Sequence, residues 1–248
     1  MPKPGLFITG TDTEVGKTVV ASAIATVLRR RNVTVGVCKP IASACRHERE
    51  RLVSPDAEAL AHFADCRATL DVINPVRYRA PLAPAVAAER TNRPVDRPAI
   101  ADSLRRLDAD HDVMLVEGIG GLMVPIDGKQ TVLDLAKWLG YPVLVVTRAD
   151  LGTLNHTAMT CSLIRSAKLR LAGLVINQFN PDTPDLAEST NPAWLARQNH
   201  TTVLATVPRT TGVAVEKGRL PDEVIDAVAV ADWQQHLQPP KAPQWLRA

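Results

Sequence analysis

Residues 10–18 read Gly-Thr-Asp-Thr-Glu-Val-Gly-Lys-Thr, and this segment constrains the fold of the chain most strongly. A short apolar run at 6–8 precedes it, and an Ala-, Val- and Ile-rich stretch at 19–28 follows it. A strand, a glycine-bounded loop and a helix in this order arrange backbone N–H groups around a triphosphate. Five residues separate Gly10 from Gly16, one more than in the usual G-x-x-x-x-G-K-[ST] loop. The sequence therefore predicts a lengthened phosphate-binding loop.

Two side chains at the end of this loop suit a nucleotide. The Lys17 ammonium can reach the β- and γ-phosphates, and the Thr18 hydroxyl can hold Mg²⁺. The alternative is a glycine-bounded turn from strand to helix in which Lys17 is incidental. The apolar segments on both sides of the loop favour the nucleotide.

Short apolar runs that recur along the chain predict buried strands at 6–9, 33–39, 113–117, 143–147, 172–177 and 203–207. They do not alternate strictly with polar residues, as is typical of strands covered on both faces. Helical patterns lie between them at 17–31, 56–64, 98–107, 132–139, 156–168 and 193–198. This alternation predicts an α/β fold, a mostly parallel, doubly wound sheet with helices on both faces. We expect one P-loop NTPase-like domain over residues 1–248.

Two segments are less regular. Residues 50–100 contain many prolines, and 80–90 read as a short helix between loops; the region either packs as an insertion or contacts a substrate, since such segments commonly shape the ligand crevice. Residues 221–237 predict a surface helix, and we expect the proline-rich end at 238–248 to fray.

Charge and apolar content exclude several classes of protein. The formal net charge is +3, and the one basic triplet, at 29–31, ends the first predicted helix, where cations complement the helix dipole. Nucleic acid is therefore not expected as a partner. No apolar run has the length of a membrane span, and residues 1–4 lead straight into a strand. We expect a cytoplasmic protein without a membrane partner.

The cysteines and histidines do not form a metal motif. The four cysteines contain no C-x-x-C pair, and the six histidines form no H-x-x-H pattern. We expect the cysteines to be small apolar or surface residues.

Polar residues follow several of the predicted strands, and the carboxyl ends of parallel strands meet at one edge of a sheet. Lys39 closes the second strand and could neutralise a substrate beside the γ-phosphate, or it could be a surface lysine with a buried stem. Glu117 ends the third strand before a glycine cluster that includes Gly118, as a Walker-B acid does. We expect its carboxylate to help hold Mg²⁺.

Three further positions have two interpretations each. Asp56 lies where a predicted helix starts, and it is either an N-terminal cap or first-turn acid of that helix, or it turns into the crevice as a metal ligand. The segment 150–155 leads into another helix, whose N–H groups could bind a carboxylate, or Asn155 could be an ordinary N-cap. Asn177 could present its amide to an adenine edge or cap a turn.

Four segments occur in an order and spacing that resemble dethiobiotin synthetase. They are 10–18, 38–43 (Cys-Lys-Pro-Ile-Ala-Ser), 116–121 (Val-Glu-Gly-Ile-Gly-Gly) and 151–156 (Leu-Gly-Thr-Leu-Asn-His). The likeness runs from about residue 5 to about residue 210. It implies an enzyme that uses ATP and Mg²⁺ to convert 7,8-diaminononanoate and CO₂ into a cyclic urea, through a carbamate and a carbamic–phosphoric mixed anhydride. It also implies a homodimer with the active site at the interface.

The resemblance further implies residue roles. Lys39, Lys17 and Thr11 would be catalytic, and Thr18, Asp56 and Glu117 would coordinate Mg²⁺. The nucleotide would contact Thr13, Glu14, Val15, Gly16, Lys17, Thr18, Val19, Asp56, Glu117, Gly118, Asn177 and Pro208. The substrate would contact Thr11, Lys39 and Ser43, and across the interface Leu151, Gly152, Thr153 and Asn155.

The chain departs from the family pattern at Ile119, where alanine is common, and after Gly212, where the likeness is poor. A partitioning or septum-positioning ATPase has a similar fold but carries a signature lysine near the position of Asp12. An amidating enzyme of corrinoid synthesis needs a further glutamine-hydrolysing domain. A module that binds nucleotide without turnover is the remaining alternative.

Overall fold

A computed structural model describes residues 1–247 of the chain. Its centre is a six-stranded parallel sheet in the order β10-β9-β8-β1-β7-β2. The strands are β1 (Gly5–Gly10), β2 (Val35–Cys38), β7 (Val113–Gly121), β8 (Val143–Thr147), β9 (Leu171–Phe179) and β10 (Val203–Pro208). All residues of β1, β2 and β8 are buried, which explains their continuous apolar sequences.

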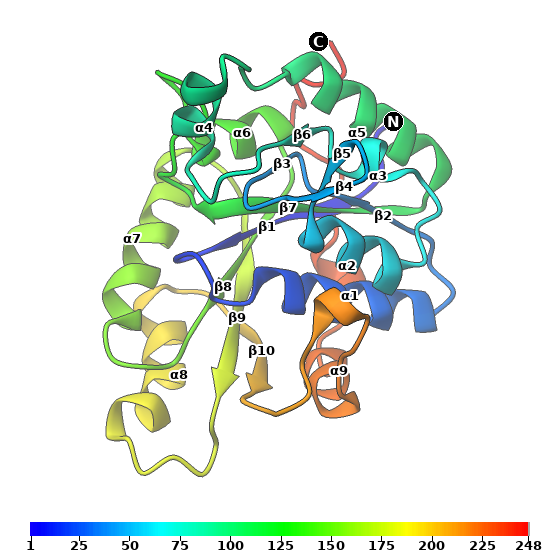
Figure 1. Cartoon of the computed structure of the whole chain (residues 1–248). Coiled ribbons are helices and arrows are strands. Elements are labelled where there is room, and N and C mark those ends of the chain that lie inside the picture. Colours follow the sequence, from blue (N-terminus) through cyan, green and yellow to red (C-terminus); the bar gives the residue numbers. More distant parts are fainter. Residues whose placement is uncertain (248) are drawn as a thin grey trace.

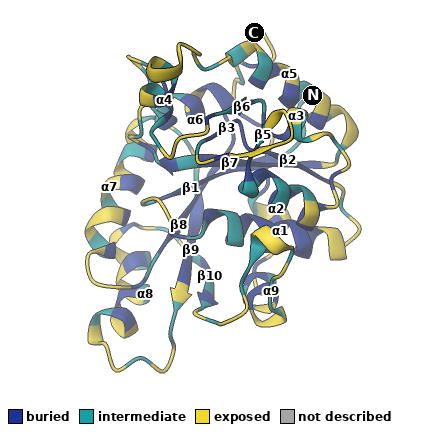
Figure 2. Ribbon diagram, viewed as in Figure 1, coloured by how far each residue is buried: buried dark blue, intermediate teal, exposed yellow. Residues whose placement is uncertain are grey.

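Helices cover both faces of this sheet (Figure 1). One face carries α1 (Lys17–Arg30), α2 (Pro55–Ala64) and α9 (Asp222–Ala229); the other carries α5 (Arg97–Asp110), α6 (Val132–Leu139), α7 (Thr153–Ser166) and α8 (Leu186–Gln198). Figure 2 shows the buried sheet between helices whose outer sides are exposed. The predicted α/β class and parallel sheet are confirmed.

Several boundaries differ from those expected. The strand that contains Glu117 continues to Gly121 because it pairs with β1 as far as Gly10. The helix expected at 156–168 begins at Thr153, after Gly152 in the left-handed region (φ 98°). The helix expected at 193–198 begins earlier, at Leu186. Pro192 lies inside this helix, and because proline usually ends or begins a helix, the sequence pattern did not indicate the turns before it.

The irregular part of the chain between β2 and α5 forms several small elements besides α2. They are β3 (Ile41–Ala42), β4 (Arg46–Glu48), β5 (Arg51–Val53), β6 (Val76–Arg77), α3 (Leu70–Ile73) and α4 (Pro84–Thr91). β3 pairs with β6 in parallel, and β4 with β5 as a hairpin. The short helix expected at 80–90 corresponds to α4.

The end of the chain packs onto the sheet and helices. Two helices, α9 and α10 (Trp233–His236), replace the single helix expected at 221–237, and Val224 of α9 and Trp233 of α10 are fully buried. We expected 238–248 to fray, and over 238–247 this was wrong: Trp245 is fully buried, and its indole N–H donates to the Leu139 carbonyl. No local pattern in the sequence indicates the apolar site that receives this tryptophan.

Two smaller expectations concern the cysteines and membranes. All four cysteines are free and buried, which agrees with small apolar positions. Within residues 1–247 no helix combines the length and apolar character that a membrane crossing needs.

Candidate active site

The phosphate-binding loop joins β1 to α1 and turns at Gly16. Gly16 is the N-cap of α1 and has a φ of 88°, a conformation that favours glycine. A Cβ at Gly16 would lie 1.9 Å from the amide nitrogen of Asn177. That nitrogen donates to the Val15 carbonyl at 2.9 Å. Asn177 therefore braces the loop from the end of β9, a contact that neither of its two expected interpretations included.

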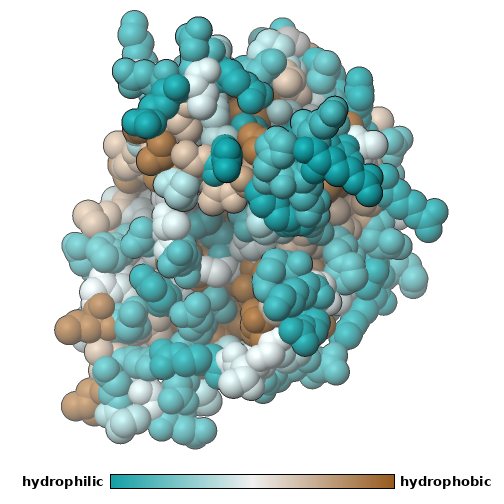
Figure 3. Space-filling view, viewed as in Figure 1, coloured by the Kyte–Doolittle hydropathy of each residue, from teal (hydrophilic) through white to brown (hydrophobic). Residues whose placement is uncertain are grey.

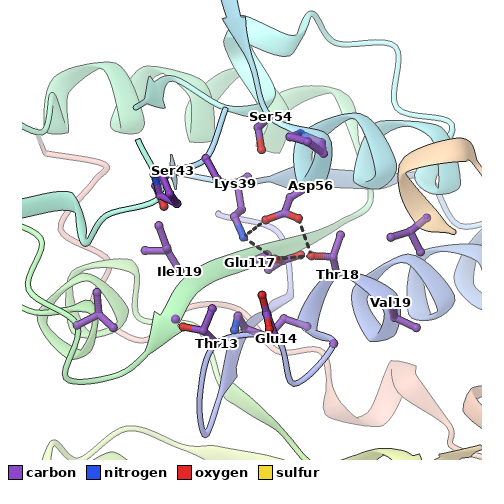
Figure 4. Close-up of a pocket in the computed structure, with 18 of the residues that line it drawn as sticks. Thr13, Glu14, Thr18, Val19, Lys39, Ser43, Ser54, Asp56, Glu117 and Ile119 are labelled. Atoms are coloured by element: carbon purple, nitrogen blue, oxygen red, sulfur yellow. Dashed lines mark hydrogen bonds and ion pairs between the residues drawn. The ribbon is translucent and has the colours of Figure 1, made fainter. Parts of the chain in front are cut away.

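Four side chains converge beside this loop, as Figure 4 shows. The Lys39 ammonium lies 2.5 Å from Glu117 Oε1 and 2.8 Å from Asp56 Oδ2, and it donates to the Gly118 carbonyl at 3.1 Å. The Thr18 hydroxyl lies 3.0 Å from Glu117 Oε1 and 3.1 Å from Asp56 Oδ1. Four separate segments of the chain thus supply one charged cluster.

Lys39 is a buried ion-pair partner, since only 3% of its side chain is exposed. The surface-lysine interpretation is therefore wrong. The backbone of Lys39 is held as well, because the side-chain amide of Asn74 donates to the Lys39 carbonyl.

Burial and pairing shift the pKa values of this cluster in different directions. Burial opposes the charge on Lys39, but Asp56 and Glu117 outweigh it and raise the Lys39 pKa. The positive charge of Lys39 lowers the pKa of the half-buried Asp56. Burial raises the pKa of Glu117. Burial, followed by repulsion from Lys39, lowers the pKa of Lys17 to about 8. The Lys39 ammonium is therefore a fixed positive charge at neutral pH.

The residues present fit a hard divalent cation. The donors are carboxylate and hydroxyl oxygens, which Mg²⁺ prefers, and Mg²⁺ needs only one or two carboxylates because it keeps waters and phosphate oxygens. The second carboxylate oxygen of Glu117 is buried and has no hydrogen-bond partner among the described residues. An unsatisfied buried oxygen in this position is suited to a cation or its water.

A cavity of about 610 Å³ opens beside the cluster. It is lined by ten of the expected residues, namely Thr13, Glu14, Gly16, Lys17, Thr18, Val19, Lys39, Ser43, Asp56 and Glu117. The middle of the chain also lines it, through Ala44, Ser54 and residues 81–83. The structure therefore brings the irregular 50–100 region to the cavity wall.

Some lining residues were missed. Ser54 caps α2 by accepting from the Ala57 N–H at 3.4 Å, so Asp56 is a first-turn acid and not the cap. A serine before Pro55 could have indicated this cap. Ala44, Pro81, Leu82, Ala83, Gly120, Val124 and Val215 also line the cavity. Residues 81–83 lie in the proline-rich region for which substrate contact was one of the two interpretations, although no motif marked them individually. Ala44, Val124 and Val215 are small or apolar residues outside the quoted motifs, so no sequence signal marked them.

The remaining expected residues lie outside the lining of this cavity. The side chain of Val15, a residue of the loop itself, is buried, and the Gly118 carbonyl accepts from Lys39. Pro208 ends β10 beside Phe179. Leu151, Gly152 and Asn155 are exposed at the start of α7. Gly152 is the N-cap, so the interpretation of Asn155 as a cap is wrong.

Thr11 and Thr153 belong to a second group of polar side chains. Thr11 Oγ1 lies 3.3 Å from Thr147 Oγ1, which lies 2.8 Å from Thr153 Oγ1. Thr147 ends β8 and was not singled out, although its place at the end of a predicted strand was a usable signal.

Comparison with known proteins relates this geometry to an activity. A family model described as an AAA domain matches residues 4–217. The chain is 37% identical over 222 residues to the ATP-dependent dethiobiotin synthetase of Thermodesulfovibrio yellowstonii, which covers 87% of this chain and 92% of that protein. It is 45% identical over 197 residues to the enzyme of the same name from Anaeromyxobacter sp. strain Fw109-5, covering 78% and 84%.

Solved structures agree on the fold. The septum site-determining protein MinD of Pyrococcus horikoshii, complexed with Mg-ADP, matches with a TM-score of 0.60 and 15% identity, covering 93% of this chain and 94% of that one. A ParA family ATPase from Chlorobium tepidum matches with a TM-score of 0.56 and 14% identity, covering 95% and 98%. Identities this low show the fold alone.

Proposed function

The chain belongs to the dethiobiotin synthetase family, and we propose that it uses ATP to convert 7,8-diaminononanoate and CO₂ into dethiobiotin. The observation that carries this proposal is the buried Lys39 ammonium, 2.5 Å from Glu117 at the edge of the phosphate-binding loop. A partitioning or septum-positioning ATPase carries its signature lysine within the loop, whereas a fixed cation at the end of β2, outside the loop, is suited to holding an anionic carbamate for phosphorylation.

The proposed chemistry has three steps. One amine of the substrate adds to CO₂ and loses a proton, which gives a carbamate. A carbamate oxygen attacks the γ-phosphorus of ATP, the bond to the β-phosphate oxygen breaks, and ADP leaves. The second amine then attacks the carbonyl carbon of the mixed anhydride and expels phosphate. No covalent bond to the protein forms, so catalysis consists of positioning and charge neutralisation.

The residues of the cavity divide this work. Lys17 and the backbone of residues 13–19 would hold the phosphates. Lys39 would hold the carbamate with Ser43 and Thr11, and its fixed charge favours the anion over the free amine. Because Lys39 stays protonated, it acts as an electrostatic clamp and not as a base. We also propose that Gly118 and, towards the base, Asn177 and Pro208 border the nucleotide.

We propose that Thr18, Asp56 and Glu117 hold Mg²⁺. When bound, the cation neutralises charge that develops on the transferred phosphoryl group. The Asp56 and Glu117 carboxylates both pair with the Lys39 ammonium, and the Thr18 hydroxyl lies within hydrogen-bond distance of both carboxylates, so the three proposed ligands lie together.

We further propose a cytoplasmic homodimer. Leu151 at the start of α7 is 87% exposed, and Leu186 at the start of α8 is 80% exposed. Figure 3 shows hydrophobic atoms along the side of the molecule where α7 and α8 lie. A second copy that covers this side would bring its Leu151, Gly152, Thr153 and Asn155 segment to the neighbouring substrate. Sedimentation equilibrium tests this: a monomer at micromolar concentration would contradict the dimer.

A direct assay tests the function. The purified chain is incubated with diaminononanoate, bicarbonate, Mg²⁺ and ATP, and dethiobiotin is measured by mass spectrometry together with ADP. We expect product only when all four are present. Absence of product from the folded chain, with ATP hydrolysis that responds to DNA or lipid, would favour a switch ATPase instead.

A further inference from the structure

Four threonine hydroxyls connect the phosphate-binding loop to α7. Thr147 Oγ1 lies at their centre, 3.3 Å from Thr11, 2.8 Å from Thr153 and 2.9 Å from Thr157, each measured to Oγ1. Thr147 and Thr157 are fully buried, and Thr153 is 4% exposed. The proposed mechanism gives no role to Thr147.

The direction of each hydrogen bond follows from counting protons. A hydroxyl has one proton and two lone pairs. Thr153 Oγ1 donates to the Arg148 carbonyl at 2.6 Å, and a carbonyl can only accept. The proton between Thr147 and Thr153 is therefore that of Thr147. With its proton used, Thr147 has two lone pairs left. The Thr157 hydroxyl lies 3.4 Å from Thr153 but only 2.9 Å from Thr147, so we assign its proton to the shorter bond. The remaining lone pair of Thr147 accepts from Thr11.

This count determines what Thr11 offers to a ligand. Its proton points inward to Thr147, so lone pairs face away from the cluster. We propose that Thr147 is a positioning residue that makes Thr11 a hydrogen-bond acceptor for an N–H group of the substrate amine or its carbamate. The inference rests on the proposed function and refines it, because Thr11 then recognises the nitrogen of the carbamate and leaves its oxygens to Lys39.

The arrangement is suited to recognition in a buried setting. Thr147 is held on three sides by hydroxyls, and each proton in the cluster has its own acceptor lone pair. If the Thr11 hydroxyl rotated away from Thr147, one buried lone pair of Thr147 would have no donor. The bond that would be lost is the longest of the three that Thr147 makes, at 3.3 Å. Loss of the Thr147 oxygen removes the acceptor altogether and frees Thr11 to donate.

Kinetics of Thr147→Val test the proposal, because valine keeps the shape and removes the oxygen. We expect the KM for diaminononanoate to rise roughly tenfold, the effect of about one misdirected hydrogen bond. The KM for ATP should stay within about twofold, because the count gives Thr147 no part in phosphate binding. Thr147→Ser keeps the hydroxyl and should restore most of the affinity. The control is Thr160→Val on α7, whose hydroxyl bonds to the His156 carbonyl outside the cluster.

Several results would overturn the inference. An unchanged KM for the diamine in Thr147→Val contradicts it, and so does an equal loss in Thr147→Ser, which would indicate packing alone. Thermal unfolding verifies that the variants fold; if the valine variant does not, Thr147→Cys replaces it, with the same expected rise in KM. A wild-type chain that makes no dethiobiotin would refute the proposed function itself, whereas an active wild type with an unaffected Thr147→Val variant refutes only this inference.

Discussion

Lys39 is the residue on which the proposed chemistry depends most. Its ammonium is the fixed cation of the cluster, with Glu117 at 2.5 Å and Asp56 at 2.8 Å. Replacement of Lys39 by Met keeps the length of the side chain and removes the charge. We expect kcat for dethiobiotin to fall roughly 100-fold or more, as when a preorganised electrostatic group is lost. Lys168→Met, in the exposed turn after α7, is the matched control and should behave as wild type.

The same variant predicts a pH-dependent loss of stability. Without Lys39, the buried Glu117 carboxylate lacks its ion-pair partner, which costs about 3 kcal/mol when the acid is ionised. Burial already raises the Glu117 pKa, so protonation relieves this cost as the pH falls. The free energy of unfolding of Lys39→Met, measured with urea in metal-free buffer, should approach that of wild type between pH 7 and pH 5. A gap that widens towards pH 5 would contradict the assigned ion pair.

Among the helices, α6 begins with a capping box in which Asp134 is the acid. The Asp134 carboxylate accepts from the Thr131 backbone N–H at 3.0 Å and from its hydroxyl at 3.1 Å. Asp134→Ala should lower the free energy of unfolding by about 1 kcal/mol. Asp226→Ala, at an exposed position on α9, is the control and should change it by less than about 0.5 kcal/mol.

The effect of Asp134→Ala should depend on pH. The hydrogen bond from the Thr131 N–H lowers the Asp134 pKa below its ordinary 3.8. The Thr131 hydroxyl and the Lys137 ammonium lower this pKa further. The carboxylate therefore contributes fully above that value, and the contribution disappears as the pH falls through the lowered pKa. Urea unfolding at pH 7 and at pH 3 measures this, and a constant difference between the two would argue against the cap.

The sequence predicted elements well where a local pattern determines them. The six apolar runs became six parallel strands, and their carboxyl ends gathered Lys17, Lys39 and Glu117 at one edge. Properties that depend on distant contacts were not predictable. Asn177 braces Val15 across 162 residues of chain, and Asn74 holds the Lys39 carbonyl although nothing in its neighbourhood marks it.

At the scale of the whole molecule, the end of the chain ties several elements together. Gln238 pairs with Gly5, Lys241 bonds to the Gly140 carbonyl, and the Trp245 carbonyl accepts from Arg105. The expectation of a frayed end failed because local composition shows neither these partners nor the burial of Trp245.

Trp245→Ala tests this packing. Removal of a fully buried tryptophan should lower the free energy of unfolding by about 3–5 kcal/mol. Trp194 on α8 is 51% exposed, and its replacement by Ala should cost under about 1 kcal/mol. Denaturant unfolding followed by circular dichroism measures both. Equal small effects would mean that the end of the chain is not part of the folded unit.

We propose that a single site of this molecule couples the cleavage of ATP to the incorporation of CO₂ into the cyclic urea. Incubation with ¹³C-bicarbonate, diaminononanoate and Mg-ATP tests it most directly, with wild type and Lys39→Met compared by mass spectrometry. We expect wild type to form dethiobiotin that is heavier by one mass unit, one for one with ADP, and the variant to form almost none. ADP release by wild type without labelled product, or equal labelling by the variant, would contradict it.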